Sequence, residues 1–91
     1  MQDKTFTELR ITQAYIKLLC IPESQYGARM VSLGRLGNWE IRMFETSHVD
    51  TADAPLFWIE LFDHHIQSSV DSCICHSIAE AVTAFDGFIS Q

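Results

Sequence analysis

The run LFWIELF, residues 56–62, restricts how this chain can fold more than any other stretch of its sequence. It is far shorter than the roughly 20 apolar residues that cross a bilayer, so we expect no membrane span. Read as a β-strand, the run alternates between two faces. One face carries Phe57, Ile59 and Leu61, and the other carries Leu56, Trp58, Glu60 and Phe62. Because both faces are largely apolar, the sheet that contains this strand needs cover on both sides.

A helix is indicated at each end of the chain. Thr5 and Glu8 form a T-x-x-E capping box. The helical pattern that follows runs to about Cys20, where Ile21-Pro22 ends it because the residue before a proline is pushed out of the helical conformation. Near the C-terminus, Ser77 and Glu80 form a second capping box. An apolar stripe follows it, formed by Ile78, Ala81, Val82, Phe85 and Ile89 with Phe88 at its flank.

Four strands are predicted between these helices. Residues 28–33 and 39–44 form a hairpin around Gly34, Gly37 and Asn38. Residues 56–62 form the third strand, and His64-His65 turns the chain into a fourth strand at 66–75. A two-residue turn there would pair Ile59 with Val70 and Leu56 with Cys73. We therefore predict one α+β domain over residues 1–91. It has two layers, a four-stranded antiparallel meander flanked by an N-terminal and a C-terminal helix, in the order α-β-β-β-β-α.

The charge of the chain argues against several classes of partner. Six basic and twelve acidic residues give a net charge of −6, and the basic residues do not cluster. Nucleic-acid binding needs several cationic side chains on one face, so we expect no nucleic-acid partner, whereas a basic protein partner is compatible with this charge. The N-terminal sequence lacks the apolar segment of a signal peptide, and the three cysteines are an odd number. We expect a cytoplasmic protein with reduced thiols.

The stretch Cys73-Ile74-Cys75-His76 is the strongest candidate for a metal or redox site. Cys73 and Cys75 are two residues apart on a strand and share a face. A zinc site needs four ligands. His64 and His65 lie at the other end of the sheet, but His76 is adjacent, and His48, Asp50 and Asp53 of the 47–55 loop are within reach, so a Cys73/Cys75/His48/His76 site is conceivable. We interpret both cysteines as half-buried strand residues and predict no bound metal or cofactor. A metal- or redox-responsive module is the alternative interpretation.

Catalysis has little support in the sequence. There is no G-x-S-x-G nucleophile elbow. Cys75, at the start of the second helix, is the candidate nucleophile, and its pKa would be slightly lowered there. The neighbouring His76 points to the opposite face of the strand and is badly placed as its base. We therefore predict that the protein is not an enzyme, with a small enzyme or ligand-binding pocket domain as a second alternative.

The excess of apolar surface points to association. The first helix is apolar around most of its circumference, which one small sheet cannot bury. The two helices can cover opposite sheet faces, or both can cover one face and leave the aromatic face for a second subunit, another protein or an apolar ligand. We predict a small acidic protein that acts through protein–protein contacts as a homodimer, regulating or escorting a partner. The predicted interface residues are Trp58, Phe62, Phe44, Leu56 and Met30.

Overall fold

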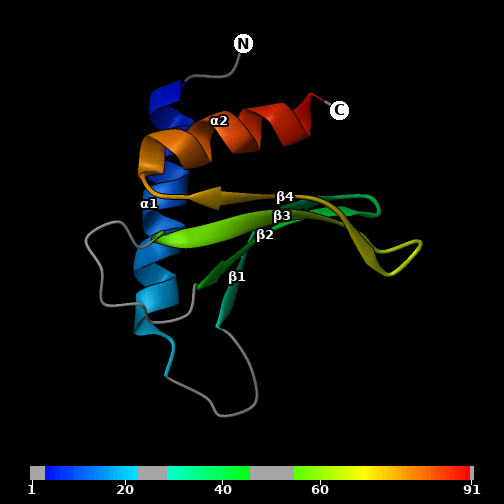
Figure 1. The fold of residues 1–91 in the computed structure, drawn as a ribbon, viewed down its shortest axis with the longest axis horizontal. Coiled ribbons are helices and arrows are strands. Elements are labelled where there is room, and N and C mark those ends of the chain that lie inside the picture. The colour runs from blue at the N-terminus through cyan, green and yellow to red at the C-terminus, as the bar shows by residue number, and fades with distance from the viewer. Residues whose placement is uncertain (1–3, 23–28, 46–54, 91) are drawn as a thin grey trace.

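The computed structural model describes residues 4–22, 29–45 and 55–90, and in the first helix the side chains from Phe6 onward. The element order is α1 (Lys4–Cys20), β1 (Met30–Leu36), β2 (Trp39–Glu45), β3 (Phe57–Asp63), β4 (Ser68–Cys75) and α2 (Ile78–Ile89). The strands form one antiparallel sheet in the order β1-β2-β3-β4 (Figure 1). The predicted α-β-β-β-β-α fold is confirmed. No helix within the described ranges has the length and apolar character needed to cross a bilayer.

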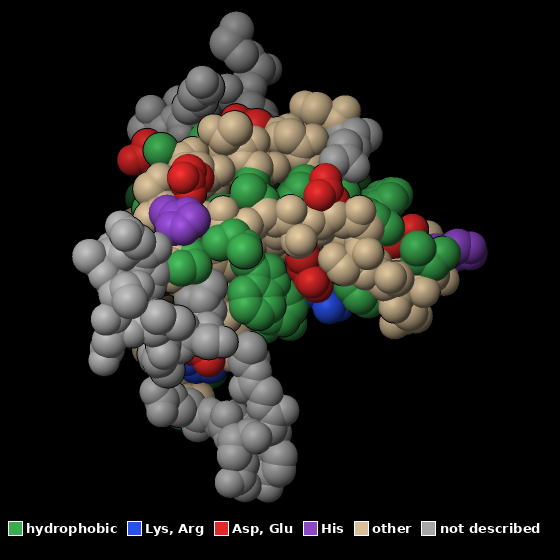
Figure 2. Space-filling model, in the orientation of Figure 1, with side chains coloured by type: hydrophobic (Ala, Val, Ile, Leu, Met, Phe, Trp, Pro, Cys, Tyr) green, Lys and Arg blue, Asp and Glu red, His purple; other side chains and the backbone are tan. Residues whose placement is uncertain are grey.

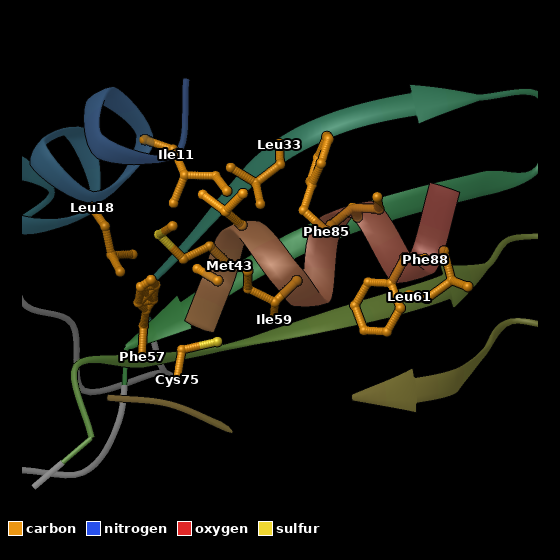
Figure 3. Close-up of a cluster of buried hydrophobic side chains, with 14 residues drawn as sticks. Ile11, Leu18, Leu33, Met43, Phe57, Ile59, Leu61, Cys75, Phe85 and Phe88 are labelled. Carbon is orange, nitrogen blue, oxygen red and sulfur yellow. The ribbon is translucent and has the colours of Figure 1, made fainter. Parts of the chain in front are cut away.

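Both helices pack on the same face of the sheet. This face carries the buried side chains of Ile41 and Met43 from β2 and of Phe57, Ile59 and Leu61 from β3. Ile11 and Leu18 of α1, and Phe85 and Phe88 of α2, join them in one hydrophobic core (Figure 3). Burying a side chain as large as Phe57 contributes about 1.5–3 kcal/mol to stability. The sequence allowed the helices to cover opposite faces of the sheet or the same face. In the structure both cover one face, and neither helix covers the other.

Of the two predicted capping boxes, only the one at the start of α2 has both of its side chains among the described residues. The helix α1 begins at Lys4, so Thr5 lies inside it, and the Thr5 side chain of the predicted capping box falls outside the described residues. At α2, the Ser77 hydroxyl accepts a hydrogen bond from the Glu80 backbone N–H at 3.2 Å. The Glu80 carboxylate accepts from the backbone N–H of His76, one residue earlier than a reciprocal capping box requires. The predicted cap at Ser77 is confirmed, with this change in the second bond.

The first hairpin turns at Gly37-Asn38, and Gly34 lies inside β1. Gly37 has a φ of 60°, a left-handed conformation that glycine adopts without steric cost. The expectation that Gly34 belongs to the turn was wrong, because β1 contains a β-bulge. Ser32 pairs with Arg42 and Gly34 with Ile41, which leaves Leu33 as the extra residue. The bulge directs the buried side chain of Leu33 toward the core.

The pairing of β3 with β4 also differs from the prediction. Ile59 pairs with Cys73 and Phe57 with Cys75, so the predicted pairing of Ile59 with Val70 was wrong by three residues. The strand β4 begins at Ser68 after a four-residue turn, not after a two-residue turn. A second bulge, between the Leu61–Asp71 and Phe62–Ser69 pairs, leaves Val70 unpaired and 43 % exposed. Together, the longer turn and the extra residue account for the shift.

Candidate interaction surfaces

An apolar row crosses the uncovered face of the sheet from edge to edge. Met30 of β1 pairs with Phe44, Phe44 with Trp58, and Trp58 with Ile74 of β4. The outer members are exposed, Met30 by 39 % and Ile74 by 61 %, while the two aromatic side chains are half-buried. Figure 2 shows hydrophobic side chains gathered near the centre of the view, next to acidic and basic side chains. We call Met30, Phe44, Trp58 and Ile74 the sheet row.

An ionic cluster occupies the part of the same face next to the sheet row. The Arg42 guanidinium donates to Glu40 at 2.9 Å and lies 3.6 Å from Glu60. His64 Nε2 lies 2.8 Å from the same Glu40 oxygen. The guanidinium carbon of Arg42 lies 3.8 Å from the centroid of the Phe62 ring, a close cation–π contact. Phe62 is therefore partly covered by this arginine.

Glu40 is the most strongly perturbed carboxylate in this cluster. Partial burial raises its pKa, because the charged form loses hydration. Hydrogen bonds from Ser32, Arg42 and His64, with the charge of Arg42, outweigh that effect and lower the pKa to about 2. Glu40 therefore stays ionised through the physiological pH range. The Arg42 guanidinium and the His64 ring are therefore already engaged with carboxylate oxygens of this cluster.

The five predicted interface residues do not have equal access to a partner. Met30 and Leu56 are exposed, whereas Phe44 and Trp58 are half-buried and stack on each other. Phe62 is half-buried beneath Arg42. The structure brings Met30, Phe44 and Trp58 together in the sheet row. Ile74, the most exposed member of that row, was missing from the predicted set because the β3–β4 register had been misassigned.

A second apolar surface lies on the outer side of α1. Phe6, Leu9, Ile16 and Leu19 are 65, 54, 56 and 55 % exposed. The positions 6, 9, 13, 16 and 20 follow alternating steps of three and four residues, the spacing of a coiled-coil seam. Gln13 is the central position of this seam, and the exposed Cys20 is its last. We call Phe6, Leu9, Gln13, Ile16 and Cys20 the α1 seam. The sequence showed that α1 is broadly apolar, but only the packed structure separates its buried side from its exposed side.

The side chains of the cysteine-histidine stretch differ in burial and in their contacts. Cys75 is fully buried, Cys73 is half-buried, and His76 is exposed with its Nδ1 3.4 Å from Glu80. No group of three or more potential ligands comes together among the described residues. His48, the other proposed ligand, lies outside those residues.

Cys75 also lacks the character of a reactive nucleophile. Burial raises the pKa of its thiol, and the neighbouring Cys73 adds to the effect, which brings the pKa to about 12. The expectation of a slightly lowered pKa was wrong, because loss of hydration outweighs the benefit of a nearby helix N-terminus. The Sγ of Cys75 lies 3.6 Å from the backbone oxygen of Cys73, a weak internal hydrogen bond. Cys75 is a core residue.

Comparison with known proteins finds no matching family model, no matching curated protein and no matching solved structure.

Proposed function

We propose that this protein is a small non-catalytic protein that acts through protein–protein contacts, and that it forms a homodimer through the α1 seam. The observation that carries this proposal is the exposure of the three large apolar side chains of the seam, Phe6, Leu9 and Ile16, each more than half accessible. Large contiguous apolar patches on small domains mark interaction sites. An exposed 3-4 spacing suits a second helix better than it suits solvent.

The seam favours an antiparallel, two-fold symmetric pairing centred on Gln13. Phe6 and Cys20 each lie seven residues from Gln13, so an antiparallel partner places the large ring of one copy against the small thiol of the other. Such large-small pairing fills the space evenly. A parallel pairing would crowd two Phe6 rings at one end and leave two Cys20 side chains underpacked at the other. Antiparallel helix dipoles also attract.

The sheet row is then the surface left for a different protein. It joins exposed apolar ends at Met30 and Ile74 to the stacked aromatic pair, and the exposed Leu56 precedes β3. The net charge of −6 favours a partner that places basic residues around the sheet row. In this proposal the dimer regulates or escorts such a partner.

The oligomeric state tests the dimer directly. Sedimentation or light scattering at high micromolar concentration should give twice the 10.4 kDa chain mass. Ile16→Glu, which places a charge in the seam, should give a folded monomer. Lys17→Glu changes an exposed α1 residue outside the seam and should leave the dimer intact. A wild-type monomer would contradict the proposal, and loss of the dimer in Ile74→Glu but not in Ile16→Glu would move the interface to the sheet row.

Oxidative cross-linking tests the direction of the pairing. In Phe6→Cys, the introduced thiol should form intermolecular disulfides with Cys20 of the second copy in an antiparallel dimer. The wild-type chain should then form few Cys20–Cys20 dimers under the same oxidant. Efficient wild-type cross-linking through Cys20 would show a parallel pairing instead.

A further inference from the structure

A pocket with a volume of about 400 Å³ opens between the first hairpin and the C-terminal half of α2, on the helix-covered side of the sheet. Its floor is made of core side chains, among them Leu61, Phe85 and Phe88. Its rim is exposed and largely apolar, formed by Leu36, Trp39 and Ile89. Arg35 also lines the pocket, and its Nε donates to the backbone oxygen of Gly37. The volume falls within the roughly 300–1,000 Å³ that small-molecule sites occupy. None of the residues that line this pocket belongs to the sheet row or to the α1 seam.

Arg10 supplies a positive charge to this apolar pocket. Its guanidinium carbon lies 5.8 Å from the centroid of the Phe85 ring. A Cβ added to Gly34 would lie 2.7 Å from Arg10 Nη2, so the glycine leaves the space that the guanidinium occupies against β1. The bulge at Leu33 creates this arrangement, because it turns Gly34 to the helix-covered side, opposite Ile41.

The guanidinium of Arg10 is not paired with a carboxylate in the described part of the chain. Arg29 pairs with Glu45, and Arg42 pairs with Glu40 and Glu60, but no described carboxylate forms an ion pair with Arg10. This is notable in a chain with twice as many acidic as basic residues. A cation beside an apolar pocket is complementary to a ligand with an anionic head and an apolar body.

We propose that this pocket binds a free monocarboxylate with an apolar tail of medium length, a fatty-acid-like molecule. The carboxylate accepts hydrogen bonds from the Arg10 guanidinium, which presents donors in a fork that matches its geometry. The tail lies on the side chains of Leu61, Phe85 and Phe88. A concave site in a protein of charge −6 suits a free amphiphile better than an anionic membrane surface, which repels this net charge.

Calorimetric titration with decanoate tests the proposal, with decanol as the uncharged probe of the same chain length. Decanoate should bind saturably with one molecule per chain, and decanol at least about tenfold more weakly, because a charge-assisted hydrogen bond is lost. Arg10→Gln should weaken decanoate binding by about tenfold and leave decanol unchanged. Lys17→Gln removes one positive charge from the same helix away from the pocket and should have no effect.

Nuclear magnetic resonance locates the bound molecule. The indole N–H signal of Trp39, at the rim, should shift during the titration, while that of Trp58, on the opposite sheet face, stays in place. Ile16→Glu should bind decanoate as the wild type does, which separates this site from the proposed dimer. The proposal is overturned if decanoate gives no saturable heat, if decanol binds equally well, or if Trp58 shifts instead of Trp39.

Discussion

The rings of Phe44 and Trp58 stack across β2 and β3, with 5.2 Å between their centroids and 14° between their planes. The two residues are direct cross-strand partners on the sheet face that neither helix covers. The contact therefore stabilises the sheet before any partner binds. Interface residues that already pack against each other lose little conformational freedom on binding.

A double-mutant cycle should measure this stacking. Phe44→Leu and Trp58→Leu, alone and together, are expected to show a coupling of about 0.5–1.5 kcal/mol in the free energy of unfolding, the range for packed aromatic pairs. Urea titration followed by circular dichroism provides the four values. The control cycle combines Phe44→Leu with Phe62→Leu, which are not cross-strand partners, and its effects should be additive. If the effects of Phe44→Leu and Trp58→Leu on the free energy of unfolding were also additive, this would contradict the stacking contact.

The stability of the protein should depend on Glu40 in acid. The pKa of Glu40 in the folded protein is about 2, against an ordinary value of 4.5. Because the folded pKa is the lower one, its contribution is complete above pH 4.5 and is lost as the pH falls toward 2. The linkage amounts to at most about 3 kcal/mol. Wild type and Glu40→Gln should therefore differ in unfolding free energy near neutral pH and converge below pH 4.5, as measured by urea titration at several pH values.

A companion variant separates the causes of that pH dependence. Arg42→Gln removes one hydrogen-bond donor and the nearby charge that hold Glu40 ionised. In the Arg42→Gln background, the difference in unfolding free energy between the chains with and without Glu40→Gln should then change less as the pH falls from 4.5 toward 2 than it does in the wild-type background. An unchanged convergence would mean that the carboxylate titrating in this window is not Glu40.

The same substitution should have opposite effects at two glycines. Gly37→Ala is expected to destabilise the protein by about 1 kcal/mol, because φ at this position is 60° and a Cβ is strained there. Gly87→Ala is expected to stabilise it by up to about 1 kcal/mol, because this residue lies in α2 and a Cβ would meet no atom within 4 Å. Thermal unfolding measures both. Equal effects of the two variants would contradict the turn conformation.

The three thiols should differ in reactivity. Cys20 is exposed, Cys73 is half-buried, and Cys75 is buried with its pKa raised to about 12. Alkylation proceeds through the thiolate, so iodoacetamide at mildly alkaline pH should label Cys20 first and Cys75 only after unfolding. Peptide mass spectrometry gives the order in dilute protein. Rapid labelling of Cys75 in the folded chain would contradict its place in the core, whereas slower labelling of Cys20 at high concentration would support the α1 seam dimer.

Much of the fold could be predicted because its signals are local. The alternation in residues 56–62 defines β3, and the Ser77 cap marks the start of α2. Proline at position 22 matches the end of α1 at Cys20. Each of these signals depends on neighbouring residues alone, so it can be recognised in a single sequence.

The register of β4 could not be predicted, because the residues around its turn carry no such local signal. Its turn, residues 64–67, has no glycine or asparagine, and Gln67 adopts the left-handed conformation with φ 55°. A turn without its usual residues gives no signal of its length. The exposed Val70 can be skipped without loss of core packing. The pocket around Arg10 was hidden as well, because it depends on the packing of α1 against β1 and α2.

The two β-bulges lie in the outermost strands, one at Leu33 and one at Val70. A strand from another molecule that tried to extend the sheet would meet a break in the hydrogen-bonding pattern at either border. Filament growth by strand addition is thereby discouraged at both ends. Contacts through a helix or a sheet face can instead close on themselves, and an assembly built on such contacts stops at a finite size.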